Sequence, residues 1–151
     1  MKTSFILFIA TGAYSGRSPW APGTMGSLVS LPICYLFSLL PWYLSLMIIL
    51  SMLPFSAWIS SEAENMLQTK DPSQVVIDEI LGMMICFFAI PFSGYTASIG
   101  FICFRFFDIL KPYPIRFIDQ TVPGGWGIVL DDVIAGIYAH IILRLILFLL
   151  F

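Results

Sequence analysis

Five apolar runs separated by short breaks make up most of this 151-residue sequence, and they decide in which solvent the chain can fold. Hydrophobic side chains account for 59% of the residues, and the mean hydropathy is +0.94. Seven basic and nine acidic side chains are too few to cover that apolar surface in water. The composition therefore predicts an all-α, multi-pass membrane protein, in which backbone polar groups are satisfied within helices. No internal repeat or linker divides the sequence, so we expect one domain over residues 1–151.

The apolar runs cover residues 28–40, 43–59, 75–90, 96–107 and 129–151. Most are shorter than the ~20 residues that cross a bilayer, so several helices are expected to be tilted, partly sunk, or extended by residues of the polar segments. The first four runs predict two helical hairpins, and the fifth predicts a C-terminal helix. Pro54 is expected to kink the second run without ending it. Residues 1–13 are expected to form a short amphipathic or interfacial helix.

The distribution of charge predicts the orientation of these helices. The hairpin tips at 41–42 and 91–95 carry no charge, whereas the polar segments lie at the open ends of the hairpins. Those segments are residues 16–27, 60–74 and 105–132. All of them therefore emerge on one side of the membrane, and their basic residues place that side in the cytoplasm. Arg144 is the exception, and we expect it to snorkel to the far interface or to pair inside the bundle.

Charge and cysteine usage disfavour several other classes of protein. The net charge is −2 and the basic residues lie among acidic ones, which is not the pattern of a nucleic-acid-binding protein. The cysteines are odd in number and lack metal-ligand spacing, which argues against a disulfide framework or a zinc site. Cys34, Cys86 and Cys103 are therefore expected to be buried apolar side chains. The single histidine, His140, is expected to have a hydrogen-bonded packing role.

Two pairs of adjacent carboxylates interrupt apolar segments: Asp78 with Glu79, and Asp131 with Asp132. Neighbouring carboxylates repel each other, more so near hydrocarbon, and a hard divalent cation such as Mg²⁺ would relieve that repulsion. All four are therefore candidate metal ligands. The alternative is that one member of each pair caps a helix N-terminus. Small residues about one turn further on (Gly82, Ala135 and Gly136) would let two helices approach closely and bring the pairs together.

A group of charged residues follows the fourth apolar run. Arg105, Asp108 and Lys111 are spaced i, i+3, i+6, so they can share one face of a helix. One interpretation is a self-satisfied ladder of salt bridges at the membrane boundary. The other is that Arg105 and Lys111 contact phosphate oxygens, while Asp108 orients them or helps to hold metal. Pro112 and Pro114 are expected to force the chain out of the helix.

Three segments on the same side are expected to be loops. The segment 22–27, rich in glycine and hydroxyl groups, precedes an apolar run and could cradle an anion with its backbone amides. Its candidate phosphate contacts are Thr24, Gly26 and Ser27. A second glycine-rich turn at 124–127 precedes the helix of the second carboxylate pair. Arg116 and Asp119 are expected in a loop, as surface or headgroup contacts rather than catalytic groups.

Four segments in this order and spacing resemble the phosphatidylglycerophosphatase A family: residues 22–27, 78–83, 104–116 and 124–136. Met84 stands where that family often has Trp, which is an apolar exchange. The resemblance implies an all-helical, Mg²⁺-dependent phosphatase of the bacterial inner membrane. Such an enzyme converts phosphatidylglycerophosphate to phosphatidylglycerol and inorganic phosphate in phospholipid biosynthesis. Its partner is then a phospholipid substrate in the membrane, with no nucleic acid and no obligate protein partner.

The residues agree with metal-assisted hydrolysis, with Asp78, Glu79, Asp108, Asp131 and Asp132 as the catalytic candidates. No cysteine has an arginine six positions later, no Asp-x-Asp occurs, and one histidine cannot supply a two-histidine mechanism. A CDP-alcohol phosphotransferase is disfavoured because its long Asp-Gly…Asp signature is not found. A small transporter component with an acidic ion path is the non-enzymatic alternative, and the clustering of charge on one face disfavours it. The identity of the general base stays open.

Overall fold

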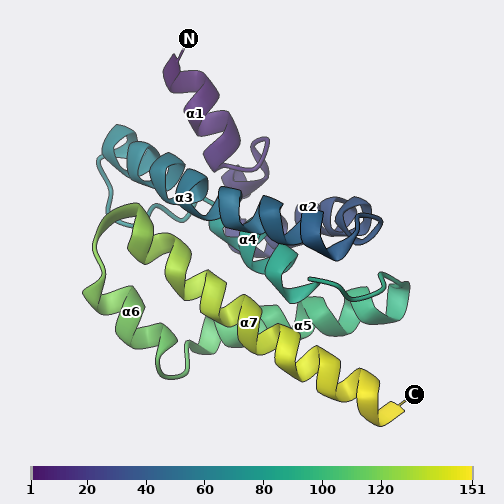
Figure 1. Cartoon of the computed structure of the whole chain (residues 1–151). Helices are drawn as coiled ribbons and strands as arrows, with labels where there is room; N and C mark the ends of the chain where they lie inside the picture. The colour runs from purple at the N-terminus through teal and green to yellow at the C-terminus, as the bar shows by residue number, and fades with distance from the viewer. Residues whose placement is uncertain (1, 151) are drawn as a thin grey trace.

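Residues 2–150 fold into seven α-helices and one short 3₁₀ turn in the computed structural model, and no strand occurs within this range (Figure 1). The elements are α1 (Lys2–Ala10), η1 (Ser15–Arg17), α2 (Pro22–Ser38), α3 (Trp42–Leu67), α4 (Ile77–Cys86), α5 (Gly94–Leu110), α6 (Ile115–Thr121) and α7 (Gly124–Leu150). Two of these helices, α3 and α7, are long and apolar enough to span a membrane. The all-α membrane architecture predicted from the composition is confirmed.

Both α3 and α7 are longer than the apolar runs that predicted them. They have 26 and 27 residues, or ~40 Å at 1.5 Å per residue, which exceeds the ~30 Å of a hydrocarbon core. Pro54 lies inside α3 and does not end it, as predicted. The predicted polar loop from residue 60 is wrong up to residue 67. Ile59 and Ala63 are buried in a cluster shared with α1, and this packing continues the helix past the apolar run.

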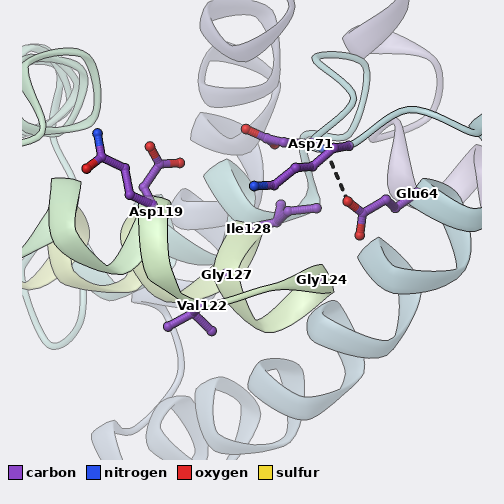
Figure 2. Close-up of a pocket in the computed structure, with 9 residues that line it drawn as sticks. Glu64, Asp71, Asp119, Val122, Gly124, Gly127 and Ile128 are labelled. Atoms are coloured by element: carbon purple, nitrogen blue, oxygen red, sulfur yellow. Dashed lines mark hydrogen bonds between the residues drawn. The ribbon is translucent and has the colours of Figure 1, made fainter.

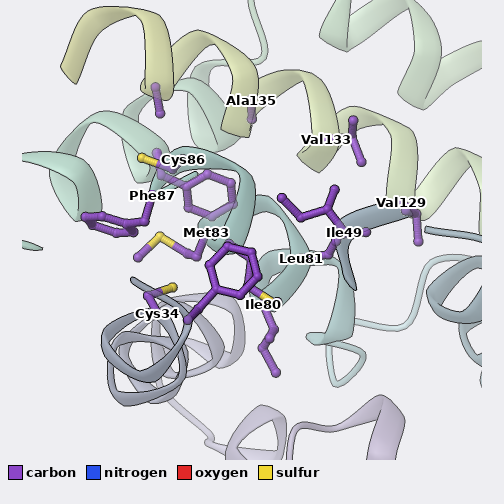
Figure 3. Close-up of a cluster of buried hydrophobic side chains, with 14 of the residues drawn as sticks. Cys34, Ile49, Ile80, Leu81, Met83, Cys86, Phe87, Val129, Val133 and Ala135 are labelled. Carbon is purple, nitrogen blue, oxygen red and sulfur yellow. The ribbon is translucent and has the colours of Figure 1, made fainter. Parts of the chain in front are cut away.

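The centre of the fold is α4, which lies among α2, α3, α5 and α7 (Figure 1). Its ten residues extend only ~15 Å, so it does not span the membrane. Figure 3 shows its side chains between Cys34 of α2 and Val133 and Ala135 of α7. Cys34 and Cys86 are buried and Cys103 is half-buried, all three as free thiols. Both helices of the first predicted hairpin, α2 and α3, pack on α4 of the second, and α4 also contacts α5.

A pair of glycines, Gly82 and Gly136, allows α4 and α7 to cross at close range. A Cβ atom on Gly82 would lie 2.5 Å from a ring carbon of Phe104 and 2.8 Å from the carbonyl oxygen of Asp132. A Cβ atom on Gly136 would overlap the carbonyl oxygen of Gly82. The close approach predicted from these small residues is confirmed.

The C-terminal end of α4 lies inside the bundle, where residues of α7 satisfy its carbonyl groups. His140 donates from Nδ1 to the carbonyl oxygen of Cys86 (3.1 Å), and Arg144 donates from Nε to Nε2 of His140 (2.9 Å). A second nitrogen of Arg144 donates to the carbonyl oxygen of Ala89 (3.1 Å). A helix end away from water needs such donors, because lipid supplies none. The packing role of His140 is confirmed, and Arg144 pairs with other groups of the bundle, as its second predicted alternative has it, although its side chain is exposed at the bundle surface rather than inside.

The segment between α5 and α7 contains a helix that the sequence did not predict. Pro112 and Pro114 follow the end of α5 at Leu110, as expected, but residues 115–121 form α6. The predicted loop around Arg116 and Asp119 is therefore wrong. The physical reason is the fully buried side chain of Ile115, which belongs to the main core and fixes the first turn of α6 against it.

Candidate active site

The polar ends of α2, α4, α5 and α7 surround a cavity of about 250 Å³. All five predicted catalytic carboxylates and both predicted phosphate-binding basic residues line it: Asp78, Glu79, Arg105, Asp108, Lys111, Asp131 and Asp132. Gly23 of α2 and Asp71 of the α3–α4 connection also line the cavity, and neither was singled out from the sequence. Charged residues from three separate sequence segments thus meet in one place.

Three of the carboxylates, Asp78, Glu79 and Asp132, form a compact group that we call the carboxylate trio. One oxygen of each lies within 4.8 Å of the other two. Asp78 and Asp132 are only 8% and 3% exposed. Oδ1 of Asp78 and Oε2 of Glu79 are buried with no hydrogen-bond partner among residues 2–150. Buried carboxylates are costly unless a cation neutralises them, so the trio fits a hard divalent cation that prefers oxygen ligands.

Burial also changes the acidity of the two carboxylates at the start of α4. It raises the pKa of Glu79 to about 7. It raises the pKa of Asp78 well above its ordinary value, and repulsion by Glu79 adds to this effect. The alternative in which one of each pair caps a helix is wrong for the second pair, whereas Asp78 and Glu79 lie in the first turn of α4, next to its N-cap, where the helix dipole favours a carboxylate. The N-cap position of α4 is Val76, and the second pair lies two turns inside α7, where no free N–H groups remain to be capped.

The fourth predicted metal ligand, Asp131, has a different environment. Its Oδ2 accepts a hydrogen bond from Nζ of Lys111 at 2.7 Å, and its Oδ1 accepts the backbone N–H of Asp132 at 3.0 Å. Lys111 also donates to Asp119 of α6 at 2.9 Å. Burial lowers the pKa of Lys111, but the hydrogen bonds and charges of Asp131 and Asp119 outweigh it and hold that pKa above its usual range. Asp131 is thus neutralised within the chain, whereas the trio is not.

Arg105 also lines the cavity, close to Glu79 of the trio, and retains hydrogen-bonding capacity. It forms an ion pair with Asp108, three residues later on α5, and one guanidinium nitrogen lies 3.5 Å from the hydroxyl of Ser27. Its Nε is buried and has no acceptor in the described part of the chain. A planar guanidinium with an unused donor suits recognition of phosphate oxygens.

The segment 22–27, predicted to be an anion-binding loop, is instead the first part of α2. Of its three predicted phosphate contacts, Thr24 and Gly26 do not line the cavity, and Ser27 is buried beside the guanidinium. Gly23 reaches the cavity, and a Cβ atom there would overlap a carboxylate oxygen of the trio. The spacing of Gly23 and Ser27 could have predicted a helix here. Ser27 lies one turn after Gly23, and its hydroxyl donates to the carbonyl oxygen of Gly23 at 2.8 Å.

A second cavity, of about 360 Å³, adjoins the first and is bounded by α3, α6 and the start of α7 (Figure 2). The predicted glycine-rich turn at 124–127 is the first turn of α7, and Gly125 donates its N–H to the hydroxyl of Ser61 on α3 (3.0 Å). Gly124 and Gly127 line the second cavity rather than the first, and Gly125 allows close packing on Ala57 and Ser61 of α3. Asp71 lines both cavities, and its backbone N–H donates to Glu64 at 3.3 Å.

Comparison with known proteins agrees with this arrangement. A family model described as phosphatidylglycerophosphatase A matches residues 8–147. The chain belongs to the phosphatidylglycerophosphatase A family. It is 37% identical over 139 residues to phosphatidylglycerophosphatase A of Escherichia coli K12, covering 91% of this chain and 81% of that protein. The same identity and length relate it to phosphatidylglycerophosphatase A of Haemophilus influenzae, with 91% and 85% covered.

A third relative carries a different name. The chain is 36% identical over 150 residues to a Bacteroides thetaiotaomicron protein provisionally named phosphatidylinositol-3-phosphatase, and 94% of each protein is covered. No solved structure matches the chain. Each of the four segments that resemble the phosphatidylglycerophosphatase A family contributes at least one residue to the 250 Å³ cavity. The family resemblance in sequence is thus concentrated where the charged side chains meet.

Proposed function

We propose that this chain is a Mg²⁺-dependent lipid phosphatase that hydrolyses phosphatidylglycerophosphate to phosphatidylglycerol and inorganic phosphate. The observation that carries the proposal is a group of three buried carboxylates, two with unpartnered oxygens, in one cavity with an arginine that has an unused donor. Family membership and the names of two relatives support the same reaction. The enzyme lies in the bacterial inner membrane, and its charged cavity faces the cytoplasm, the side to which the positive-inside rule assigns its basic residues.

In this proposal the carboxylate trio holds the metal. When bound, Mg²⁺ polarises the phosphoryl group and favours deprotonation of the attacking water. Water adds to phosphorus, the bond from phosphorus to the glycerol oxygen breaks, and that oxygen leaves as the alcohol of phosphatidylglycerol. Arg105 binds the phosphoryl oxygens and offsets the charge that develops on them. Asp108, ion-paired with Arg105, holds the guanidinium in place.

Lys111 and Asp131 complete the proposed machinery. The ammonium of Lys111 is held at the cavity by Asp131 and stays charged, so it adds a second positive group for the substrate phosphate. Asp131 therefore acts chiefly by positioning Lys111, and we assign the metal to the other three carboxylates. Thr24 and Gly26 receive no role in this assignment, and Ser27 supports the guanidinium rather than the phosphate.

The experiment is phosphate release by the purified protein from phosphatidylglycerophosphate, with Mg²⁺ or with excess chelator. Phosphatidylinositol 3-phosphate is the first comparison substrate, because of the name of the Bacteroides relative. Phosphatidic acid and lysophosphatidic acid test whether the second phosphate of the headgroup is needed. We expect Mg²⁺-dependent release that is fastest with phosphatidylglycerophosphate. Full activity in chelator would refute the metal mechanism, and faster release from the phosphoinositide would refute the substrate.

A further inference from the structure

A shallow apolar groove of about 300 Å³ lies between α2 and α5, away from the charged cavity. Six residues line it: Leu28, Leu31, Ala97, Ser98, Phe101 and Ile102. The only polar side chain among them is Ser98, and its hydroxyl donates to the carbonyl oxygen of Gly94 at 2.8 Å. The groove therefore offers a hydrocarbon-like surface with no unused donor.

The groove is aligned with the phosphate-binding end of the cavity. Ser27 and Arg105 lie 3.5 Å apart where α2 and α5 meet the cavity. Leu31 lies four residues after Ser27, and Phe101 lies four residues before Arg105, so each is one turn further along the same helix face. The groove thus begins about one helical turn, or ~5 Å, from the backbone of Ser27 and Arg105 along the helix axes and leads away from the charged end.

A second apolar cavity of similar size, about 290 Å³, helps to decide between possible occupants. It is lined by residues of α3, α4 and α7, among them Leu46, Ile137 and His140. None of these helices carries Arg105 or Lys111. Of these two grooves, the one between α2 and α5 therefore continues from the headgroup of a lipid whose phosphate is bound at Arg105.

We propose that the groove between α2 and α5 holds one acyl chain of the lipid whose phosphate is bound at Arg105. This inference rests on the proposed lipid phosphatase activity and adds the path of the chain. Because bilayer hydrocarbon is as apolar as the groove, the contact adds little affinity. Its effect is orientation, since a chain fixed one turn below Arg105 sets the depth at which the phosphoryl group meets the carboxylate trio.

The first test fills the groove with Ser98→Phe and fills the unrelated cavity with Ile137→Phe as a matched control. Both side chains are exposed on outward helix faces. Each variant is assayed with dioleoyl phosphatidylglycerophosphate and with its deacylated headgroup. We expect Ser98→Phe to lower kcat/KM roughly tenfold on the dioleoyl lipid and less than twofold on the headgroup. Ile137→Phe should change both values less than twofold.

Equal losses with the two variants, no loss with Ser98→Phe, or the same loss on both substrates would overturn the acyl-chain path. Failure of the proposed function is a different result, because the wild-type protein would then release no phosphate from the dioleoyl lipid.

The second test uses the unaltered protein, so it does not depend on the folding of a variant. A phosphatidylglycerophosphate with a photoreactive diazirine in one acyl chain is irradiated with the protein in phosphatidylcholine vesicles, and the labelled peptides are identified. We expect labels on α2 and α5 that excess unlabelled substrate removes. Labels spread over all lipid-facing helices, or labels that excess substrate leaves unchanged, would overturn the proposal.

Discussion

At its C-terminal end α4 meets donors on α7, whereas at its N-terminal end it meets another carboxylate. His140 and Arg144 donate hydrogen bonds to the last carbonyl groups of α4 and the turn after it. Asp78 and Glu79, at the other end, face Asp132 of α7, and the trio contains buried oxygens that no group in residues 2–150 satisfies. Within residues 2–150, α7 thus satisfies the polar groups at the C-terminal end of α4, whereas carboxylate oxygens at the N-terminal end stay unpaired.

This difference separates a structural polar group from a functional one. Buried polar groups in native proteins are normally paired, so an unpaired group needs an explanation. The far end shows that α7 can supply donors to α4 where the fold needs them. Within the described residues, no donor reaches Oδ1 of Asp78 or Oε2 of Glu79, which points to a cation from outside the chain. The four predictions below test this contrast, from the largest expected effect to the smallest.

Asp132→Asn is expected to have the largest effect, because it removes one ligand of the trio. We expect phosphate release to fall by a factor on the order of 10³. In chelator the same variant should unfold at a higher temperature than the wild type, because three mutually repelling carboxylates become two. Mg²⁺ should raise the Tm of the wild type and leave that of Asp132→Asn nearly unchanged. A variant that keeps the full Mg²⁺-dependent rise in Tm would refute the metal role of this residue.

Arg105→Gln removes the unused donor that shares the cavity with the trio, and we expect kcat/KM to fall roughly 10²-fold. The variant also leaves Asp108 without its ion-pair partner, so some stability is lost. The double variant Arg105→Gln with Asp108→Asn should recover the Tm and not the activity. If the double variant recovered activity, Arg105 would be a structural group rather than a phosphate contact. Steady-state kinetics and thermal unfolding in detergent measure the two effects.

Arg144→Met disrupts the hydrogen-bonded C-terminal end of α4, because it removes two hydrogen bonds and keeps the length of the side chain. We expect a loss of about 1–3 kcal/mol in the free energy of unfolding. At about 2–4 °C for each kcal/mol, the Tm should fall by several degrees. The activity per folded molecule and the rise in Tm with Mg²⁺ should both persist. If Mg²⁺ no longer raised the Tm of this variant, metal binding at the N-terminal end of α4 would depend on the hydrogen bonds at its C-terminal end, which contradicts the prediction.

Asp119→Asn should have the smallest effect. It removes one of the two carboxylates that hold Lys111, and Asp131 remains at 2.7 Å. Because Asp119 is about a third exposed, the pair is worth ~1 kcal/mol or less, which is at most about a fivefold change in kcat/KM. Asp131→Asn is the comparison and should cost distinctly more. A hundredfold loss with Asp119→Asn would place Asp119 within the catalytic machinery.

The charged residues of the site could be predicted because few physical situations place adjacent carboxylates in apolar segments. The helical conformation of the starts of α2 and α7 could not be predicted, since the glycines at 22–27 and 124–127 are compatible with a loop or with a closely packed helix. In loops they provide freedom of the backbone, and in these helices they allow contact with the α3–α4 connection and with α3. That choice depends on neighbours that are distant in the sequence.

The position of α4 at the centre of the bundle could also not be predicted from the sequence. Apolar runs predict the helices that contain them, but they do not state which helices touch. The special role of Asp131 depends on the same information, because it follows from the approach of Lys111 and α6. In the sequence the four paired carboxylates look equivalent, but the packing places three of them in the trio and pairs Asp131 with Lys111.

The close contact between Gly82 of α4 and Gly136 of α7 is a pivot that lies between the carboxylate trio and the hydrogen bond from His140 to Cys86. Gly82 lies four residues from both Asp78 and Cys86, and Gly136 lies four residues from both Asp132 and His140. A tilt of α4 about this pivot that spreads the carboxylates must also strain the hydrogen bonds at the far end. The spacing of the carboxylates is therefore coupled to the hydrogen bonds at the other end of α4, eight residues away along each helix.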